Sequence, residues 1–332
     1  MITKHLAPAI ERFYRDRKVM VSPEVQMALT EQIAEHNKQS LEQWSSGEDS
    51  EKGRNPVTAS SATKCVLSNW FSHNKFPSEP LPGRAAATFR IGHLVEADLY
   101  CAAVLAGEEV SHFQHQMKAT LGGWTSNAYI DFLHKSSIDG KRRIVDVKTM
   151  SSYSYEKIFK RNQKMDDTFG YLGQFSVYAA QGIKDGIVDS PEVLVLCYNK
   201  NTGHIGEYLY EAEVSKVEEA HANSALVQKH TEYLPGQAPP FEVDVGKMDA
   251  NRPPRPKGYE PELMRNGDYK LGLQCSYCPY KFSCWTRPHQ RIHIGIGPHE
   301  NPLPMYDTQE PLDQWVEVEY KSGKPIFVIK RR

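Results

Sequence analysis

The chain has 332 residues, and its 40 Lys and Arg residues nearly balance its 41 Asp and Glu residues. Bulk charge therefore indicates no nucleic-acid partner, and any basic groove has to be local. The length allows one large domain or two modest ones. No run reaches the roughly 18 apolar residues of a membrane span, and the N-terminal segment lacks the apolar core of a signal peptide. Six cysteines are too few for a disulfide scaffold, so we expect a cytoplasmic protein whose clustered cysteines bind metal or do redox chemistry.

Hydrophobic periodicity and turn residues predict alternating groups of helices and strands. Helices are expected over 22–44, 57–71, 85–106, 171–182 and 214–232, with a polar loop over 45–56. Strands are expected over 128–134 and 142–150, over 191–199 and 206–214, and in a terminal hairpin around Ser322-Gly323. A Pro-rich linker is expected over 235–262. Helices that flank a central set of strands indicate an α/β domain.

The first predicted hairpin brings charged residues together. If Asp139-Gly140 is a two-residue turn, Asp131 lies opposite Lys148, and Asp146 shares their face of the sheet. Two carboxylates suit Mg²⁺ or Mn²⁺, and a neighbouring lysine can position or deprotonate an attacking water. The alternative is an exposed, salt-bridged hairpin without chemistry, which is the commoner origin of an isolated D-x-K.

Two further residue pairs accompany this trio. Gly92 and Glu96 lie four residues apart on the preceding helix, and Gln174 and Tyr178 lie four apart on the following helix. In this order the sequence resembles the PD-(D/E)xK nucleases, specifically their RecB-like exonuclease branch, over roughly residues 57–290. The family's order is G-x-x-x-(E/H), an Asp strand, (D/E)-x-K and Q-x-x-x-Y. Four elements in order are more specific than any one of them.

The resemblance implies a restriction-endonuclease-like core, with a central mixed sheet flanked by helices, and a role for each matched residue. Asp131 and Asp146 would ligate the metal, with the Val147 carbonyl as a further ligand and Glu96 as an outer or additional one. Lys148 would orient or activate the water, and Gln174 and Tyr178 would steady the site or contact the strand. Many members carry His at the position of Glu96, and more carry Glu than Asp at position 146. For Glu96 taken alone, the alternative is an exposed helix carboxylate.

Three cysteines, Cys275, Cys278 and Cys284, follow the spacing C-x2-C-x5-C, and Cys65 lies 210 residues before the first of them. Thiolates are soft ligands that suit Zn²⁺ or an iron–sulfur cluster. The layout is similar to that of the CRISPR-adaptation nucleases and the AddB subunits, in which one cysteine precedes the nuclease motifs and three follow. That resemblance implies a [4Fe–4S] cluster that staples the chain ends, with Cys65 as the fourth ligand.

Other readings of the cysteines stay open. A zinc site could use the C-x2-C-x10-H-x3-H pattern that ends at His289 and His293, although its spacing is short and omits Cys284. Cys101 and Cys197 are expected to be core thiols. The aromatic residues among the clustered cysteines are expected to pack around the metal, with base stacking as the weaker alternative. These aromatic residues are Tyr277, Tyr280, Phe282 and Trp285.

A basic segment follows the D-x-K strand. On a helix, Lys157, Lys160, Arg161 and Lys164 would share one face and could contact phosphates. A solvated helix face is the equal alternative.

Together these features predict a metal-dependent DNA exonuclease that acts on ends or single strands in recombination, repair or phage DNA metabolism. The expected units are a helical extension over 1–56, the nuclease domain over 57–290 and a C-terminal extension over 291–332. No phosphate-binding G-x-x-x-x-G-K-(S/T) loop is present, so unwinding would need a separate helicase, and a recombinase or annealing protein is a further candidate partner. The alternatives are a structure-selective or CRISPR-spacer trimming endonuclease of the same fold, or a catalytically inactive DNA-binding module.

Overall fold

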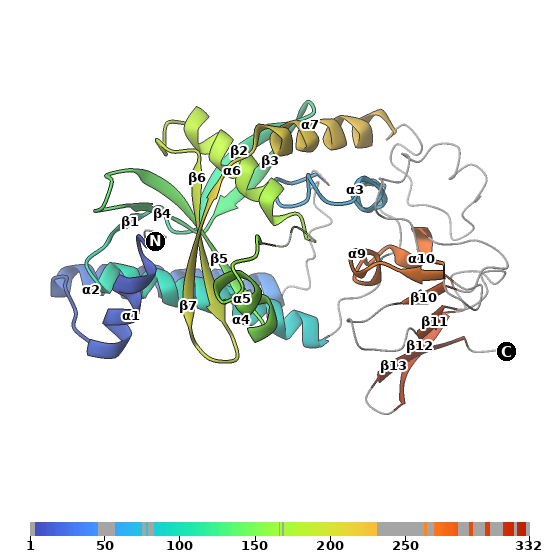
Figure 1. The fold of residues 1–332 in the computed structure, drawn as a ribbon, viewed down its shortest axis with the longest axis horizontal. Helices are drawn as coiled ribbons and strands as arrows, with labels where there is room; N and C mark the ends of the chain where they lie inside the picture. The colour runs from blue at the N-terminus through green and yellow to red at the C-terminus, as the bar shows by residue number, and fades with distance from the viewer. Residues whose placement is uncertain are drawn as a thin grey trace.

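A computed structural model describes residues 4–45, 57–74, 78, 83–165, 167, 169–230, 262–263, 269–284, 292–294, 303–305, 315–321 and 324–329. Its centre is a five-stranded mixed sheet in the order β1-β4-β5-β6-β7 (Figure 1). These strands are β1 (Glu109–Ser111), β4 (Phe132–Lys135), β5 (Arg142–Met150), β6 (Glu192–Asn199) and β7 (Ile205–Glu211). β5 and β6 pair in parallel, and the other neighbours are antiparallel. The expected mixed α/β architecture, with helices on both sides of the sheet, is confirmed.

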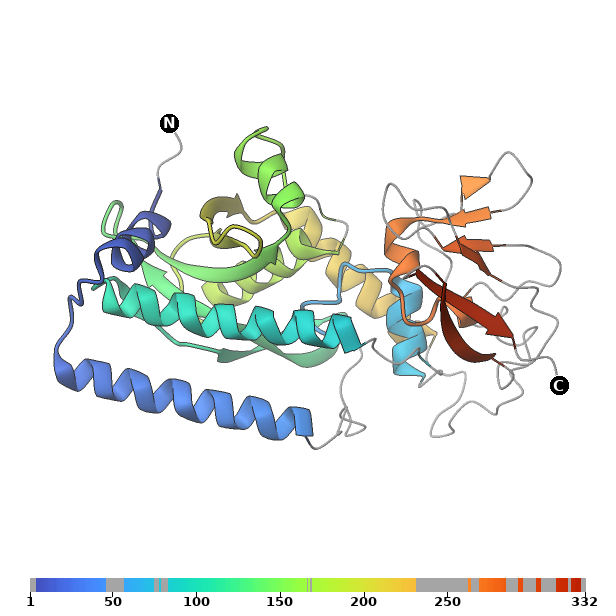
Figure 2. The ribbon, with the colours of Figure 1, turned by 90° about the horizontal axis from the view of Figure 1, so that it is seen from below.

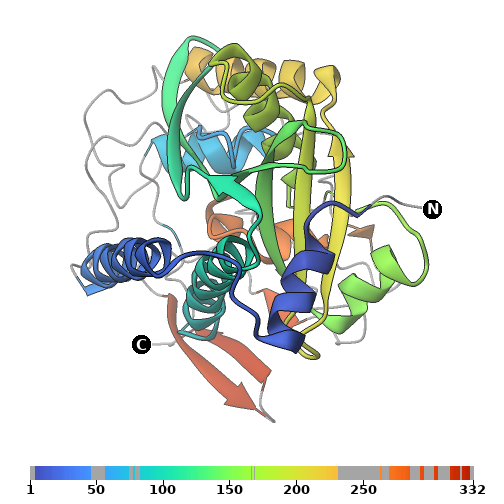
Figure 3. The same cartoon turned by 90° about the vertical axis from the view of Figure 1, so that its left-hand side faces the viewer.

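Alternation along β5 and β6 gives the sheet two apolar faces. Val145, Val147, Leu194 and Leu196 face one cluster, which includes residues of α1 (Ala7–Asp16), α2 (Pro23–Ser45) and α4 (Gly83–Leu105). Figures 2 and 3 show α2 and α4 side by side. The opposite cluster contains Ile144, Val193 and Val195 together with residues of α3 (Val66–His73), α6 (Tyr171–Lys184) and α7 (Val214–Lys229). Burial on both faces explains why β6 is continuously hydrophobic from Val193 to Cys197.

Smaller elements surround this core. β2 (His115–Leu121) and β3 (Trp124–Ile130) form a separate hairpin, and α5 (Ser152–Phe159) follows β5. A four-stranded sheet contains β8 (Glu262–Leu263), β9 (Tyr269–Leu271), β10 (Ile292–Ile294) and β11 (Leu303–Met305), with α9 (Leu273–Ser276) and α10 (Lys281–Cys284) nearby in sequence. β12 (Trp315–Lys321) and β13 (Lys324–Ile329) form the expected terminal hairpin. Within the described residues, no helix combines the length and the apolar character needed to cross a bilayer.

The predicted elements differ from the structure in a few places. The helix expected over 57–71 begins only at Val66, because the Ser61 hydroxyl accepts a hydrogen bond from the Thr58 amide and stabilises turns instead. The strand expected over 128–134 is broken at Asp131, between β3 and β4. Helix α1 and the β2–β3 hairpin were not predicted. The expected polar loop and Pro-rich linker lie almost wholly outside the described residues.

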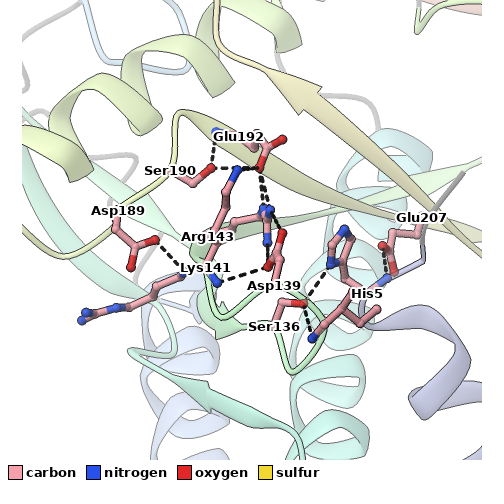
Figure 4. Close-up of polar contacts among 11 residues, drawn as sticks. His5, Ser136, Asp139, Lys141, Arg143, Asp189, Ser190, Glu192 and Glu207 are labelled. Carbon is pink, nitrogen blue, oxygen red and sulfur yellow. Dashed lines mark hydrogen bonds and ion pairs between the residues drawn. The ribbon is translucent and has the colours of Figure 1, made fainter.

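The register of the β4–β5 hairpin is shifted by two residues from the prediction. Phe132 pairs with Val145, and the Ser136 amide bonds the Lys141 carbonyl, so the loop between them has four residues. The cause is Arg143, only 1% exposed, whose guanidinium binds the carboxylates of Asp139 and Glu192 (Figure 4). Asp139 is therefore held back toward the strand and is not free for a two-residue turn. A shift of two keeps each side chain on its predicted face.

The N-terminus of α1 is fastened to β7 by one buried carboxylate. Glu207 accepts hydrogen bonds from the backbone amides of His5, Leu6 and Ala7 at 2.5, 2.7 and 2.9 Å. These amides have no partner inside the helix, so Glu207 caps α1 from a distant strand (Figure 4). The N-terminal helix is thereby tied to the outer strand of the sheet.

The Arg143 network predicts a pH-dependent stability. Hydrogen bonds from the Arg143 guanidinium lower the pKa of Asp139 below its ordinary value. The carboxylate therefore stabilises the fold above about pH 3.9, and this contribution is lost as the pH falls through the lowered pKa. We expect Asp139→Asn to reduce the free energy of unfolding by about 1–2 kcal/mol at pH 7, measured by urea denaturation. A deficit that stays constant down to pH 2 would contradict the charge argument.

Candidate active site where β4 leaves β3

Asp131 occupies the single position between β3 and β4. Its carboxylate takes the place of the backbone carbonyl that would otherwise accept a hydrogen bond from the Val147 amide. The register places Val147 opposite Ile130, but Ile130 pairs with β2 in the other hairpin. The Val147 amide donates instead to Asp131 Oδ2 at 2.6 Å. The requirement that a buried amide find a partner thus positions the carboxylate against β5.

Asp146 and Lys148 project from the same face of β5. Their side chains form an ion pair, and Asp146 is 2% exposed while the Lys148 side chain is 17% exposed. The Lys148 Nζ lies 5.0 Å from the ring centroid of Tyr171 and 5.5 Å from that of Phe175, both on α6. The lysine is therefore held between a carboxylate and two aromatic rings, an arrangement that limits its motion.

Electrostatics at the site reflect a surplus of negative charge. Burial raises the pKa of Asp131 well above its ordinary value, and the charges of Glu96 and Asp146 raise it further, against the opposing effects of Lys148 and the Val147 amide. Burial also raises the pKa of Asp146, despite Lys148. Although burial lowers the pKa of Lys148, the charges of Asp146 and Asp131 outweigh it, so the net pKa is raised. Three carboxylates facing one ammonium favour the addition of a cation.

Glu96 and the pair on α6 complete the surroundings. Glu96 Oε2 lies 3.2 Å from His93 Nδ1 and 3.3 Å from Gln114 Nε2. Gln174 Nε2 donates to the Tyr178 hydroxyl at 3.1 Å, as expected for residues one helical turn apart. Tyr178 is buried, and its pKa is raised by burial and by the charge of Asp146. A tyrosine this buried can support the carboxylates but is poorly placed to contact a nucleic acid.

The described residues contain no group of three His, Cys, Asp or Glu side chains already arranged to hold a metal ion. Asp146 is engaged by Lys148, and Asp131 by the Val147 amide. The donors nevertheless fit a hard divalent cation, because they are all oxygens and carry excess negative charge. Asp146 Oδ1 is buried and, apart from this ion pair, accepts no hydrogen bond of ordinary geometry.

The segment that contains Cys275, Cys278 and Cys284 lies against α3 (Figures 1 and 2). Helix α3 itself begins directly after Cys65. Cys278 Sγ lies 3.7 Å from the Ser68 hydroxyl, and the Tyr280 ring stacks on Phe71 at 5.8 Å. Burial raises the pKa of Cys65 to about 11. Cys65 and Cys284 both pack against the hydrophobic cluster that includes α3.

The fourth expected ligand, Cys275, contacts Cys278 through the backbone. Cys275 lies one turn before Cys278, whose amide bonds the Cys275 carbonyl at 3.2 Å. None of these four described cysteines forms a disulfide, and their soft sulfur donors suit a thiolate-bound cluster in chemistry, although they are not arranged as a metal-binding group in this structure.

The other cysteine expectations have separate outcomes. Cys197 is a fully buried core thiol, as expected. Cys101 is half-buried and packs against the hydrophobic core on the face of the sheet covered by α1, α2 and α4. His289 of the zinc alternative lies outside the described residues, as does the side chain of His293.

The basic segment after β5 does not form the expected single helix face. Helix α5 ends at Phe159, and Asn162 has a φ of +50°, which takes the backbone out of the helix. Lys157 Nζ lies 4.8 Å from the ring centroid of Tyr153, and Lys160 pairs with Glu156 at 2.6 Å. Arg161 and Lys164 follow the helix and are exposed.

Two residues of the site were missed by sequence reasoning. Tyr171 packs against Lys148 and lies three residues before Gln174, a helical spacing that could have drawn attention to it. Lys64 directly precedes Cys65, and its side chain is exposed. A Cβ added to Gly170 would lie 3.1 Å from the Lys64 Cγ, which places this cation beside the turn at the start of α6.

No protein-family model and no curated protein matches the chain. A solved structure described as "Crystal structure of SSO0001" is similar to it, at 13% identity over 80% of this chain and 97% of that one. The TM-score of 0.36 is too low to carry an argument about function.

The crowded carboxylates predict that Asp131 destabilises the metal-free protein. Because its folded pKa is raised, its contribution to stability is greatest below about pH 3.9 and is lost as the pH rises. Asp131→Asn keeps an acceptor for the Val147 amide and removes the charge. We expect a gain of about 1 kcal/mol in the free energy of unfolding at pH 7, measured by urea denaturation in chelator.

The exposed carboxylate of Glu218, on α7, supplies the control for this change. Glu218→Gln should leave the stability unchanged. An Asp131→Asn protein that is less stable than wild type at pH 7 would show that the carboxylate charge is stabilising after all.

Proposed function

We propose that this protein is a metal-dependent deoxyribonuclease with a restriction-endonuclease-like core, and that it hydrolyses phosphodiester bonds at DNA ends or in single strands. The observation that carries the proposal is the meeting of Asp131, Asp146 and Lys148 at the divergence of β3 and β4. Its support is chemical, because a buried and a half-buried carboxylate beside a fixed lysine suit phosphodiester hydrolysis. The order of the motifs along the chain adds the resemblance to the RecB-like exonucleases.

Each side chain has a role under this proposal. Asp131 and Asp146 would hold a Mg²⁺ or Mn²⁺ ion, with the Val147 carbonyl and Glu96 as further ligands. When bound, the ion would supply charge neutralisation on the phosphate and a more acidic water. Lys148 would hold the attacking water and offset the negative charge that develops on the phosphate oxygens. Tyr178 and Gln174 would keep the Asp146 side of the site rigid.

A cleavage assay tests the proposal. We expect wild-type protein with Mn²⁺ to shorten end-labelled linear DNA and to spare a closed circle, and Lys148→Ala to slow cleavage by about 10²- to 10⁴-fold. Strands labelled at either the 5′ or the 3′ end give the polarity, which has to be measured. The exposed Lys118 on β2 supplies the matched control, because Lys118→Ala removes an exposed lysine charge from a different sheet.

The same assay separates the alternatives. Cutting of the closed circle would favour an endonuclease of the same fold. Wild type and Lys148→Ala that are equally inert on every substrate would overturn the enzyme and leave a DNA-binding module. Thermal unfolding of each variant shows whether a loss of activity is a loss of folding, since Lys148→Ala leaves the buried Asp146 without its ion-pair partner.

We further propose that Cys65, Cys275, Cys278 and Cys284 bind a [4Fe–4S] cluster. Anaerobically purified wild type is expected to contain about four irons and four sulfides per chain. Cys65→Ser should lose most of the iron, whereas Cys101→Ser should retain it, because Cys101 lies in the core cluster on the other face of the sheet. Stoichiometric zinc in place of iron would replace this cofactor with the zinc alternative.

A further inference from the structure

A continuous row of aromatic rings leads from Lys148 to the cysteine segment. Lys148 Nζ lies 5.0 Å from the Tyr171 centroid, the Tyr171 and Phe169 centroids are 6.1 Å apart, and those of Phe169 and Tyr277 are 6.3 Å apart. The row connects the candidate active site with the turn between Cys275 and Cys278. Three segments distant in sequence therefore contribute to one surface.

The far end of this row is open to solvent. Phe169 is 40% exposed and Tyr277 is 59% exposed. Tyr277 leaves more than half of its surface in solvent, whereas Tyr280 packs on Phe71. Two large rings left in solvent beside a charged site invite a ligand with flat apolar faces.

Hydrogen bonds hold the backbone that directly follows Phe169. The Gly170 amide bonds the Asp167 carbonyl at 2.9 Å, and the Leu172 amide bonds Asp167 Oδ1 at 2.9 Å. Gly170 has a φ of +72°, and its carbonyl accepts a hydrogen bond from the Thr63 hydroxyl at 3.3 Å. The ring is thus presented on a fixed turn at the start of α6, which lowers the entropy lost on binding.

Cations accompany the rings. Lys64 is exposed and packs beside this turn, since a Cβ added to Gly170 would lie 3.1 Å from the Lys64 Cγ. Arg161 and Lys164 are exposed in the segment that precedes Phe169. Flat apolar rings beside exposed positive charges match the bases and phosphates of an unpaired strand. A purely apolar protein partner would leave these cations without a counterpart.

We propose that Phe169 and Tyr277 form a stacking platform for unpaired bases of a DNA strand that enters the candidate active site. The inference rests on the proposed nuclease function and adds the form of its substrate. Stacking needs single-stranded DNA, because paired bases are buried in the duplex. It is tolerant of sequence, because every base has an aromatic face.

Binding without cleavage tests the platform. The full-length protein is titrated into a fluorescent 12-nucleotide single strand in chelator, and the dissociation constant is measured by anisotropy. We expect Tyr277→Ala and Phe169→Ala each to weaken binding by about 5- to 100-fold, the loss measured for one stacked base. Tyr277→Phe keeps the ring and should bind like wild type. Ile183→Ala removes an exposed apolar side chain (46% exposed) from the opposite end of α6 and should have no effect.

A strand with abasic sites in place of bases sharpens the test. Wild type should bind this strand as weakly as the Phe169→Ala/Tyr277→Ala double variant binds the normal one, and the double variant should not distinguish the two strands. Equal binding of both strands by wild type, or unchanged binding by both alanine variants, would overturn the platform. Phe169 lies outside the cysteine segment, so the iron content of Phe169→Ala, measured beside its affinity, separates lost stacking from disturbed thiols.

The platform and the nuclease can fail separately. Stacking-dependent binding with no cleavage in Mn²⁺ would remove the enzyme and leave a single-strand binding site. Cleavage that depends on Lys148, with binding that ignores both rings, would keep the enzyme and remove the platform. Tighter binding of a blunt duplex than of the single strand would also overturn the stacking platform.

Discussion

The hydrogen bond from the Val147 amide to the Asp131 carboxylate is the constraint on which the site depends. β3 leaves the main sheet at Ile130 to pair with β2, and this departure opens a gap in the ladder beside β5. A buried amide needs a partner, and Asp131 supplies it at 2.6 Å. The same contact brings a carboxylate beside Asp146, against the repulsion between them. A backbone requirement thus holds together charges that would otherwise separate.

The repulsion between the Asp131 and Asp146 carboxylates lowers the stability of the fold. The surrounding residues reduce this loss but do not remove it. Lys148 neutralises part of the charge, and the Tyr171 and Phe175 rings lie over its ammonium. Asp131 and Asp146 still have raised pKa values. Sites that sacrifice stability in this way are typical of functional centres, where the local arrangement serves a ligand and not the fold. The Arg143 cluster at the other end of the hairpin has the opposite character, because its charges compensate one another.

Much of the site could be predicted from sequence because its signals are local. The D-x-K spacing puts Asp146 and Lys148 on one face of a strand, and a four-residue spacing puts Gln174 beside Tyr178. The hairpin register could not be predicted, because the loop is set by Glu192, which comes from β6 and reaches Arg143 across the sheet. Lys64 was missed for a related reason, since only the folded chain brings it to the turn before α6. Contacts with residues much later in the sequence, such as Glu192, override the turn preference of Asp139-Gly140.

Glu207 has a consequence for the order in which the protein is made. The amides that it caps belong to residues 200 to 202 positions earlier in the chain. At 5–20 residues per second, a ribosome needs about 10–40 seconds to add that length. During this interval the start of α1 lacks its final partner and has only water to bond. The start of α1 therefore cannot reach its native environment before the chain has been made past residue 207.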